Sequence, residues 1–319
     1  MLEEAKEKWT GAINEVVIGA TKAEGGTRAA GVTIGGDKSL PFMHYEAPIK
    51  NRPIVALEVW DREPDDWPQP LMEALGDAVK SPVAWAKKGI EEFGADLICL
   101  KLMSTHPDFG DATAKDAVQT VKAVLAATSA PLIIWGCEHD EKDNEVLPRC
   151  SEAAKGEKCL MGVVTEDNYK TLVASCIADG HSLIGLSPID INIAKQINIL
   201  VMEMGFPANR IVMYPTTGAL GYGLEYCYSI QERGRVAALS GDKMMAMPVI
   251  CMVGQEAWHA KEARAPKEEA PDWGDEKTRG LFWEIATAVA LLEAGSDILV
   301  LRHPAAIKAT KDTINKLMA

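Results

Sequence analysis

The sequence predicts an α/β fold, a (β/α)8 TIM barrel with an N-terminal β-hairpin-like extension. Short apolar runs alternate with segments of helical period along most of the 319 residues. Most of these runs are continuously apolar, which is typical of parallel strands buried on both faces. A helix–glycine–strand junction also occurs twice, at residues 92–98 and 293–299. A repeated unit of this kind is expected of a barrel built from β/α pairs.

Eight apolar runs are the expected barrel strands. They cover Ile54 to Trp60, Leu97 to Leu102, Leu132 to Cys137, Leu160 to Val164, Ser182 to Leu186, Ile211 to Tyr214, Val249 to Val253, and Ile298 to Leu301. Between them, apolar residues recur at helical spacing, as in residues 118–125 and 193–204. An open, doubly wound sheet is the alternative arrangement of the same elements.

Residues that favour helix ends lie between the predicted elements. Ser81 before Pro82, Asp111 and Asp190 are expected N-caps. A last helix is expected from Pro304 to Met318. Glycines that suit the ends of helices follow several of them: Gly94, Gly180, Gly205 and Gly295.

The chain is expected to form one structural domain in two parts. Residues 1–52 form an N-terminal extension packed on the barrel, and residues 53–319 form the barrel itself. Strands near Glu15 to Gly19 and Gly31 to Ile34, on either side of Gly25-Gly26, predict a hairpin within the extension.

Composition excludes several classes of function. A formal net charge of −13, without a large Lys/Arg cluster, argues against a nucleic-acid partner. No apolar run approaches the roughly 18 residues that span a bilayer, and residues 1–6 are charged, so we expect a cytoplasmic protein without a membrane partner. The seven cysteines include no C-x-x-C pair, which argues against an iron–sulfur cluster or structural zinc in this chain.

In a barrel of this kind, functional residues lie on the loops after the strands. Two such loops are long, Asp61 to Lys80 and Gln255 to Lys277, and both carry prolines and tryptophans, among them Trp258. They are interpreted either as a partner-docking surface or lid, or as solvated insertions. The segment Tyr214 to Gly223 is rich in glycine, so it forms either a tight turn, which sequence alone favours, or a close approach to a large flat ligand.

Lys101 lies within the second strand and has two interpretations. A buried lysine with a lowered pKa can form a Schiff base, as in an aldolase. The favoured interpretation is an ion pair with Glu58 on the adjacent strand.

Three other segments carry polar residues at strand ends. Cys137 to Asp140 contains four types of metal ligand, but neighbouring residues diverge, so a metal site is not favoured. Asp190 to Asn192 matches the hydrogen-bonding edge of a pterin, although Asp190 is a natural N-cap. Arg302-His303 suits phosphate binding or acid–base chemistry, and a surface histidine is the favoured interpretation.

Several long strings of residues resemble one family. They are residues 19–22, 25–28, 51–53, 187–192, 195–196, 218–226, 241–244, 247–251, 256–258 and 302–304. On these strings the chain resembles the small subunit of the corrinoid iron–sulfur protein of the reductive acetyl-CoA (Wood–Ljungdahl) pathway, the delta-type subunit of acetyl-CoA decarbonylase/synthase.

The resemblance implies a heterodimer in which this barrel has no catalytic residue of its own. The large subunit would carry a 4Fe–4S cluster and share a cobalamin (corrinoid) with this chain. The cobalamin would carry a methyl group from methyltetrahydrofolate, through a separate methyltransferase, to CO dehydrogenase/acetyl-CoA synthase. An autonomous pterin-dependent methyltransferase barrel is the alternative.

The loops after the sixth and seventh strands are expected to border the corrinoid. This expectation rests on loop position and glycine content. The residues assigned to this border are Tyr214, Thr217, Gly218, Gly221, Tyr222 and Trp258.

Overall fold

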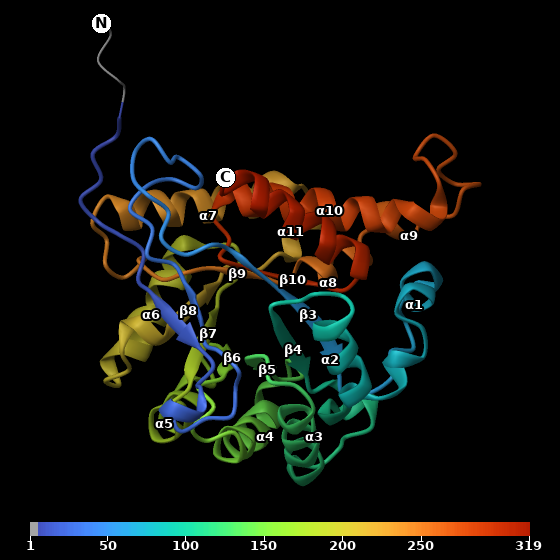
Figure 1. Ribbon diagram of the computed structural model, residues 1–319, viewed down its shortest axis with the longest axis horizontal. Coiled ribbons are helices and arrows are strands. Elements are labelled where there is room, and N and C mark those ends of the chain that lie inside the picture. Colours follow the sequence, from blue (N-terminus) through green and yellow to red (C-terminus); the bar gives the residue numbers. More distant parts are fainter. Residues whose placement is uncertain (1–5) are drawn as a thin grey trace, which may run out of the picture.

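Eight parallel strands form the centre of the molecule (Figure 1). The computed structural model describes residues 6–319, so the expectation drawn from the charged residues at 1–5 lies outside it. The barrel strands are β3 (Ile54–Trp60), β4 (Leu97–Lys101), β5 (Leu132–Trp135), β6 (Leu160–Val164), β7 (Ser182–Leu186), β8 (Ile211–Tyr214), β9 (Ile250–Cys251) and β10 (Ile298–Leu301). All eight predicted strands are present.

The strands follow the order β8-β7-β6-β5-β4-β3-β10-β9 and are parallel throughout. A single bridge between Met213 and Val249 brings the two ends of this sheet together, and Met213 N donates to Pro248 O at 2.8 Å. The sheet is therefore a nearly closed barrel. A doubly wound sheet would reverse its strand order at a switch point, so the barrel prediction is confirmed.

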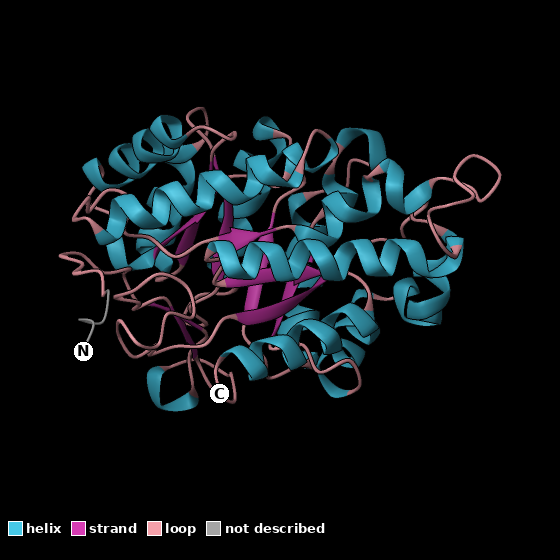
Figure 2. Ribbon diagram, turned by 90° about the horizontal axis from the view of Figure 1, so that it is seen from above, coloured by secondary structure: helices cyan, strands magenta, loops and turns pink. Residues whose placement is uncertain are grey.

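Helices surround the strands (Figure 2). They are α1 (Gln69–Leu75), α2 (Pro82–Glu91), α3 (Ala114–Ala127), α4 (Asp140–Ala153), α5 (Tyr169–Asp179), α6 (Ile191–Glu203), α7 (Leu224–Leu239), α8 (Val253–His259), α9 (Lys261–Arg264), α10 (Glu276–Ala294) and α11 (Pro304–Leu317). Helices α1 and α9 lie within the two loops that the sequence predicts to be long, and α8 begins at Val253, before the second of these loops. Across residues 6–319, none of the helices has the length and apolar character needed to cross a membrane.

Most predicted helix ends agree with the structure. Ser81 and Asp190 cap α2 and α6 with their side chains. Asp111 is not an N-cap, so that prediction was wrong: Thr113 caps α3 and forms a reciprocal capping box with Asp116. Asp111 instead accepts a hydrogen bond from Lys142 Nζ at 2.6 Å.

Two apolar layers build the core because side chains alternate along each barrel strand. In β3, Val55, Leu57 and Val59 face the surrounding helices, whereas Ile54 and Ala56 face the barrel axis. Glu58 follows the inward parity, so the barrel interior changes from apolar to charged toward the carboxyl ends of its strands. This change positions the polar side chains described below.

The predicted N-terminal hairpin is present and lies over the amino end of the barrel. Strands β1 (Val16–Ile18) and β2 (Val32–Ile34) pair antiparallel. Val16 and Ile18 belong to the apolar layer inside the barrel, and Gly19 N donates to Lys158 O at 2.8 Å, just before β6. Figure 1 shows this hairpin lying in front of the barrel strands. The boundary between residues 52 and 53 stays a prediction.

Candidate functional site

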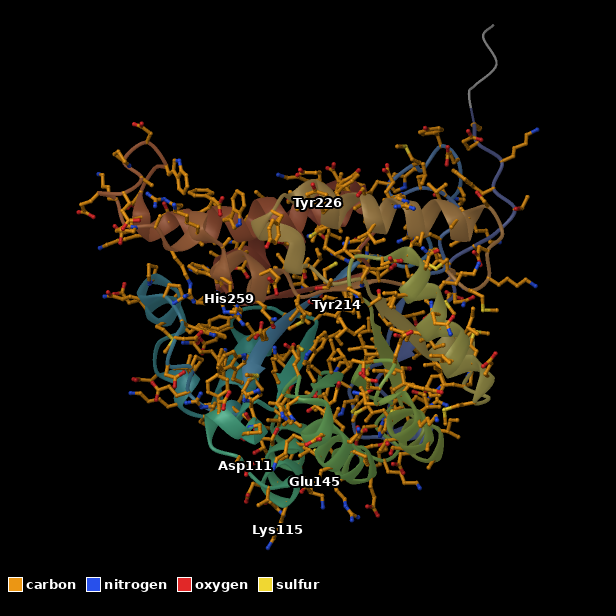
Figure 3. The ribbon with its side chains drawn as sticks, turned by 180° about the vertical axis from the view of Figure 1, so that it is seen from behind. Asp111, Lys115, Glu145, Tyr214, Tyr226 and His259 are labelled. Carbon is orange, nitrogen blue, oxygen red and sulfur yellow. The ribbon has the colours of Figure 1, made fainter. Side chains whose placement is uncertain are left out.

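The carboxyl ends of the barrel strands meet on one side of the molecule, which we call the upper face. Figure 3 views the molecule from the side opposite to Figure 1 and labels Tyr214, Tyr226 and His259 on this face. These residues come from β8, α7 and α8, three elements that follow one another around the barrel. Ligand sites of such barrels are built on this face.

The glycine-rich loop after β8 presents backbone and one aromatic ring to solvent. Gly218 and Gly221 are exposed, and a Cβ at Gly221 would meet no heavy atom within 4 Å. The ring of Tyr222 is 89% exposed. These three predicted residues therefore lie together on the upper face, where a ligand has free access to them.

Two predicted residues of the same loop are buried. The ring of Tyr214 meets Trp135 edge to face at 5.3 Å, and the Tyr214 hydroxyl lies 3.4 Å from Thr217 Oγ1. Burial raises the pKa of Tyr214, so its phenol stays neutral. Tyr214 and Thr217 thus fix the base of the loop, and a ligand above it does not reach them without a rearrangement.

Trp258 lies at the end of α8 and is 1% exposed. Its Nε1 donates to Glu284 Oε2 at 2.8 Å, and its ring stacks on His303. A Cβ at Gly280 of α10 would overlap this ring, so the missing side chain makes room for it. Trp258 supports α8, which packs against the 3-10 turn at Gly218–Gly221, but its ring is not on the surface.

Sequence reasoning missed the acid that holds Trp258. Glu284 Oε1 accepts from Arg302 N at 2.6 Å, and both Glu284 oxygens lie 3.3 Å from His303 N. Burial raises the pKa of Glu284 to about 7, although these hydrogen bonds oppose the shift. His303 also caps α11 through Nδ1 and is partly buried, with a pKa lowered to about 4 by burial. The interpretation as a surface histidine therefore holds only in part, because His303 is partly exposed but also caps α11 and stacks on Trp258.

Lys101 points into the mouth of the barrel, and its predicted partner was wrong. Lys101 Nζ donates to Glu138 Oε1 at 2.8 Å and to Gln255 Oε1 at 2.6 Å. Glu58 lies deeper because strand register pairs it with Cys99, two residues before Lys101. We call Lys101, Trp135, Glu138 and Gln255 the mouth cluster; Trp135 Nε1 also donates to Glu138 Oε1, at 3.0 Å.

Glu58 pairs instead with Arg302. The Arg302 Nε and Nη2 atoms donate to the two Glu58 oxygens at 2.9 and 2.7 Å, and both side chains are buried. Burial alone would raise the pKa of Glu58, but the charges of Arg302 and Lys101 lower it. Arg302 therefore has a carboxylate partner that sequence reasoning did not find.

The segment Cys137 to Asp140 sends its side chains in different directions. Cys137 is buried, Glu138 binds Lys101, and His139 caps α4 by accepting from Lys142 N. In the part of the chain that is described, three or more His, Cys, Asp or Glu side chains do not gather as a metal-binding group.

Asp190 has a structural role at the start of α6. Its Oδ1 accepts from Asn192 N at 2.7 Å and from Ile193 N at 3.3 Å. The favoured interpretation as an N-cap is therefore confirmed.

The two long loops lie next to each other at one edge of the upper face. Arg264 Nη2 donates to Asp66 O at 3.0 Å. A groove of about 530 Å³ lies between the loops, with Asp66, Glu73, Arg264, Lys267 and Glu276 among its lining residues. Because both charge signs line this groove, it does not indicate an anion or cation site.

Comparison with solved structures supports the class of protein that the barrel defines. Dihydropteroate synthase from Xanthomonas albilineans, solved with 4-aminobenzoic acid, has a TM-score of 0.56 and 15% sequence identity, and the match covers 83% of this chain and 92% of that one. Dihydropteroate synthase from Thermus thermophilus has a TM-score of 0.52 at 15% identity, over 83% and 93% of the two chains. At this identity the likeness shows a shared TIM-barrel fold alone.

Comparison with known sequences identifies the family. The family model described as CO dehydrogenase/acetyl-CoA synthase delta subunit matches residues 15–310. The acetyl-CoA decarbonylase/synthase complex subunit delta of Archaeoglobus fulgidus is 39% identical over 99% of this chain and 70% of its own length. Subunit delta 1 of Methanosarcina thermophila is 38% identical over 97% and 72%, and subunit delta of Methanopyrus kandleri is 36% identical over 95% and 75%. The chain belongs to the CO dehydrogenase/acetyl-CoA synthase delta subunit family, as the resemblance in its sequence indicated.

Proposed function

We propose that this chain is the small subunit of a heterodimeric corrinoid iron–sulfur protein and helps to hold a cobalamin that it shares with the large subunit. The family match over residues 15–310 is the observation that carries this proposal. When bound, the cobalamin would supply a cobalt centre able to carry a methyl group from methyltetrahydrofolate, through a separate methyltransferase, to acetyl-CoA synthase.

The chemistry of the upper face fits a large, flat ligand that is covered from one side. The exposed backbone at Gly218 and Gly221 lets such a ligand approach closely, because no Cβ stands in the way. The exposed ring of Tyr222 offers a further apolar surface beside them. These three residues would contact the cobalamin directly.

The buried members of the predicted site would act as positioning residues. Tyr214 and Thr217 hold the base of the loop, and Trp258 supports the neighbouring helix α8. Their contribution is to keep the loop in place and to exclude water beneath it. In this proposal the barrel has no catalytic residue of its own.

The proposed division of labour agrees with the cysteines of this chain. All seven are buried, at Cys99, Cys137, Cys150, Cys159, Cys176, Cys227 and Cys251. Burial raises the pKa of Cys137 to about 11 and that of Cys159 to about 12, which disfavours the thiolate that a cluster needs. We therefore place the 4Fe–4S cluster on the large subunit.

The proposed partners follow from this role. The large corrinoid and iron–sulfur subunit would be the stable partner, and the methyltransferase and CO dehydrogenase/acetyl-CoA synthase would bind transiently. We propose a cytoplasmic location and neither a nucleic-acid nor a membrane partner, in keeping with the net charge of −13.

Co-expression with and without the large subunit tests the proposal. A visible cobalamin spectrum is expected in the co-purified pair, with cobalt and iron measured in the same sample. A colourless pair would contradict the proposal. Binding of methyltetrahydrofolate by the isolated chain would instead support the alternative, a pterin-dependent methyltransferase barrel.

A further inference from the structure

Only one oxygen of the Glu138 carboxylate, at the mouth of the barrel, accepts hydrogen bonds from the described residues. Its Oε1 accepts from both Lys101 Nζ and Trp135 Nε1. Among the hydrogen bonds of residues 6–319, none reaches Oε2, and 39% of the side chain is exposed. Since each oxygen of an ionised carboxyl group is an acceptor, Oε2 keeps its capacity to bind an N–H group from outside.

The backbone holds Glu138 in a conformation that non-glycine residues rarely adopt. Its φ is +68°, in the left-handed region. Asp143 fixes the turn by accepting from Cys137 N at 2.8 Å and from Glu138 N at 3.0 Å. A Cβ at Gly136 would overlap the Asp143 carboxyl group, so the loop closes tightly around this acid. The carboxylate is therefore placed before a ligand arrives, at a cost in backbone strain.

The charge that a ligand meets at this point is negative. Burial alone would raise the pKa of Glu138, but the charge and hydrogen bond of Lys101 and the hydrogen bond of Trp135 lower it. Lys101 is 3% exposed and is covered by its partners, whereas the Glu138 carboxylate is open. The site thus favours a neutral or cationic N–H donor and disfavours an acid.

A contact between two buried rings joins the mouth cluster to the base of the glycine-rich loop. The ring of Trp135, whose Nε1 binds Glu138, also contacts Tyr214 at the base of the loop. Thr216, in that loop, has a φ of +59°, so backbone strain occurs on both sides of the ring contact. A flat ligand over Gly218 and Tyr222 would have its edge near the barrel mouth.

We propose that Glu138 Oε2 accepts a hydrogen bond from a primary carboxamide on the edge of the corrin ring. This inference rests on the function proposed above. Acetamide and propionamide side chains fringe the corrin ring, and each has an NH2 group that can donate to a carboxylate. Glu138 is in this sense a specificity-determining residue, because a carboxylic acid at the same edge of the ligand would meet a like charge.

Corrinoids that differ in one group test this assignment. The heterodimer, freed of corrinoid, is titrated with cobalamin and with its monocarboxylic acids, in which one carboxamide at a time is hydrolysed. The wild-type pair is expected to bind one of these acids about tenfold or more weakly than cobalamin. With Glu138→Gln, which presents an NH2 group at the place of Oε2, the same acid is expected to bind as well as cobalamin or better.

The matched control is Glu145→Gln, the same chemical change on helix α4 at the rim of the upper face (Figure 3). It is expected to keep the wild-type preference at every position. Equal affinity of the wild-type pair for cobalamin and for all the acids would overturn the assignment of Glu138, even where Glu138→Gln fails to assemble. A preference that Glu138→Gln leaves unchanged would overturn it as well. A wild-type pair that binds no cobalamin would overturn the proposed function itself.

Discussion

Arg302 and Glu58 join the last barrel strand to the first through two hydrogen bonds, at 2.9 and 2.7 Å. They meet because β10 pairs with β3 in a register that sets Leu301 opposite Leu57, which brings the next residues of both strands side by side. Trp60 Nε1 donates to the same Glu58 carboxylate at 2.6 Å, and the Arg302 guanidinium lies over the ring of Trp67. A fully buried ion pair thus reinforces the contact between these two paired strands.

Breaking this pair on one side should destabilise the protein strongly. Arg302→Met leaves Glu58 as a buried charge without its partner, so we expect the free energy of unfolding to fall by about 3–5 kcal/mol. The double variant Glu58→Leu/Arg302→Met should recover most of that loss, because no unpaired charge remains. Urea unfolding measures both. An equal loss in the single and double variants would contradict the argument, and Asp77→Asn, in an exposed pair, serves as the control.

Glu284 should make stability depend on pH near neutrality. Burial raises its folded-state pKa from 4.5 to about 7, so the folded state holds a proton that the unfolded state releases. The contribution of Glu284 to the free energy of unfolding is therefore greatest below pH 4.5, and this contribution is lost as the pH rises to about 7. The full effect is about 3 kcal/mol.

The variant Glu284→Gln isolates this contribution. It cannot titrate, so its free energy of unfolding should decline less than that of the wild type between pH 5 and pH 8. It should also be less stable than the wild type at low pH. One carboxyl oxygen becomes an NH2 group, so either Trp258 Nε1 or Arg302 N loses its hydrogen-bond acceptor. Parallel pH profiles for the two proteins would refute the assignment.

Gly221 should affect retention of the corrinoid without affecting the fold. No heavy atom lies within 4 Å of a Cβ placed there, so Gly221→Phe should leave the unfolding curve unchanged. The added ring would occupy the space over the loop, and the cobalt content of the purified heterodimer should fall. Cobalt content equal to that of the wild type would remove Gly221 from the proposed site.

A side chain at Gly280, unlike one at Gly221, should destabilise the fold. Its Cβ would overlap the buried ring of Trp258, so Gly280→Ala should lower the free energy of unfolding by about 1–3 kcal/mol. Near-ultraviolet circular dichroism would report the displaced tryptophan. Full stability in this variant would mean that α10 moves away from Trp258 at little cost.

Replacement of Thr216 should raise the stability of the protein, because a β-branched residue with a φ of +59° is strained. Thr216→Asn keeps a side-chain acceptor for Gly218 N, which now donates to Thr216 Oγ1 at 3.1 Å, and asparagine tolerates this conformation better. We expect a gain of about 1 kcal/mol in the free energy of unfolding. Thr216→Ala loses the acceptor and keeps the strain, so it should be less stable than the wild type.

The barrel could be predicted from the sequence because its signals are local. Most of the buried parallel strands are continuous apolar runs in the sequence. Ser81 and Asp190 cap α2 and α6 through contacts with neighbouring residues only. Strand β9 is shorter than its apolar run, since α8 begins at Val253. Helix α3 is capped by Thr113 and not by Asp111, because the side chains of Thr113 and Asp116 form a reciprocal capping box.

The polar site was harder to predict because strand register decides its contacts. Glu58 and Lys101 lie on adjacent strands and both face inward, yet they are offset by two residues along the barrel axis. Glu58 therefore meets Arg302, which is 244 residues away in the sequence. The burial of Trp258 depends on Gly280 and Glu284, and the sequence near Trp258 contains no sign of either.

The hairpin at the amino end of the barrel determines how the chain can be shortened. Val16, Ile18 and Ile34 complete the apolar layer inside the barrel. A fragment that begins at residue 53 would therefore expose apolar side chains at the amino end of the barrel. Such a fragment is expected to aggregate during folding, although every barrel strand would be intact. The smallest unit worth expressing therefore begins before Val16.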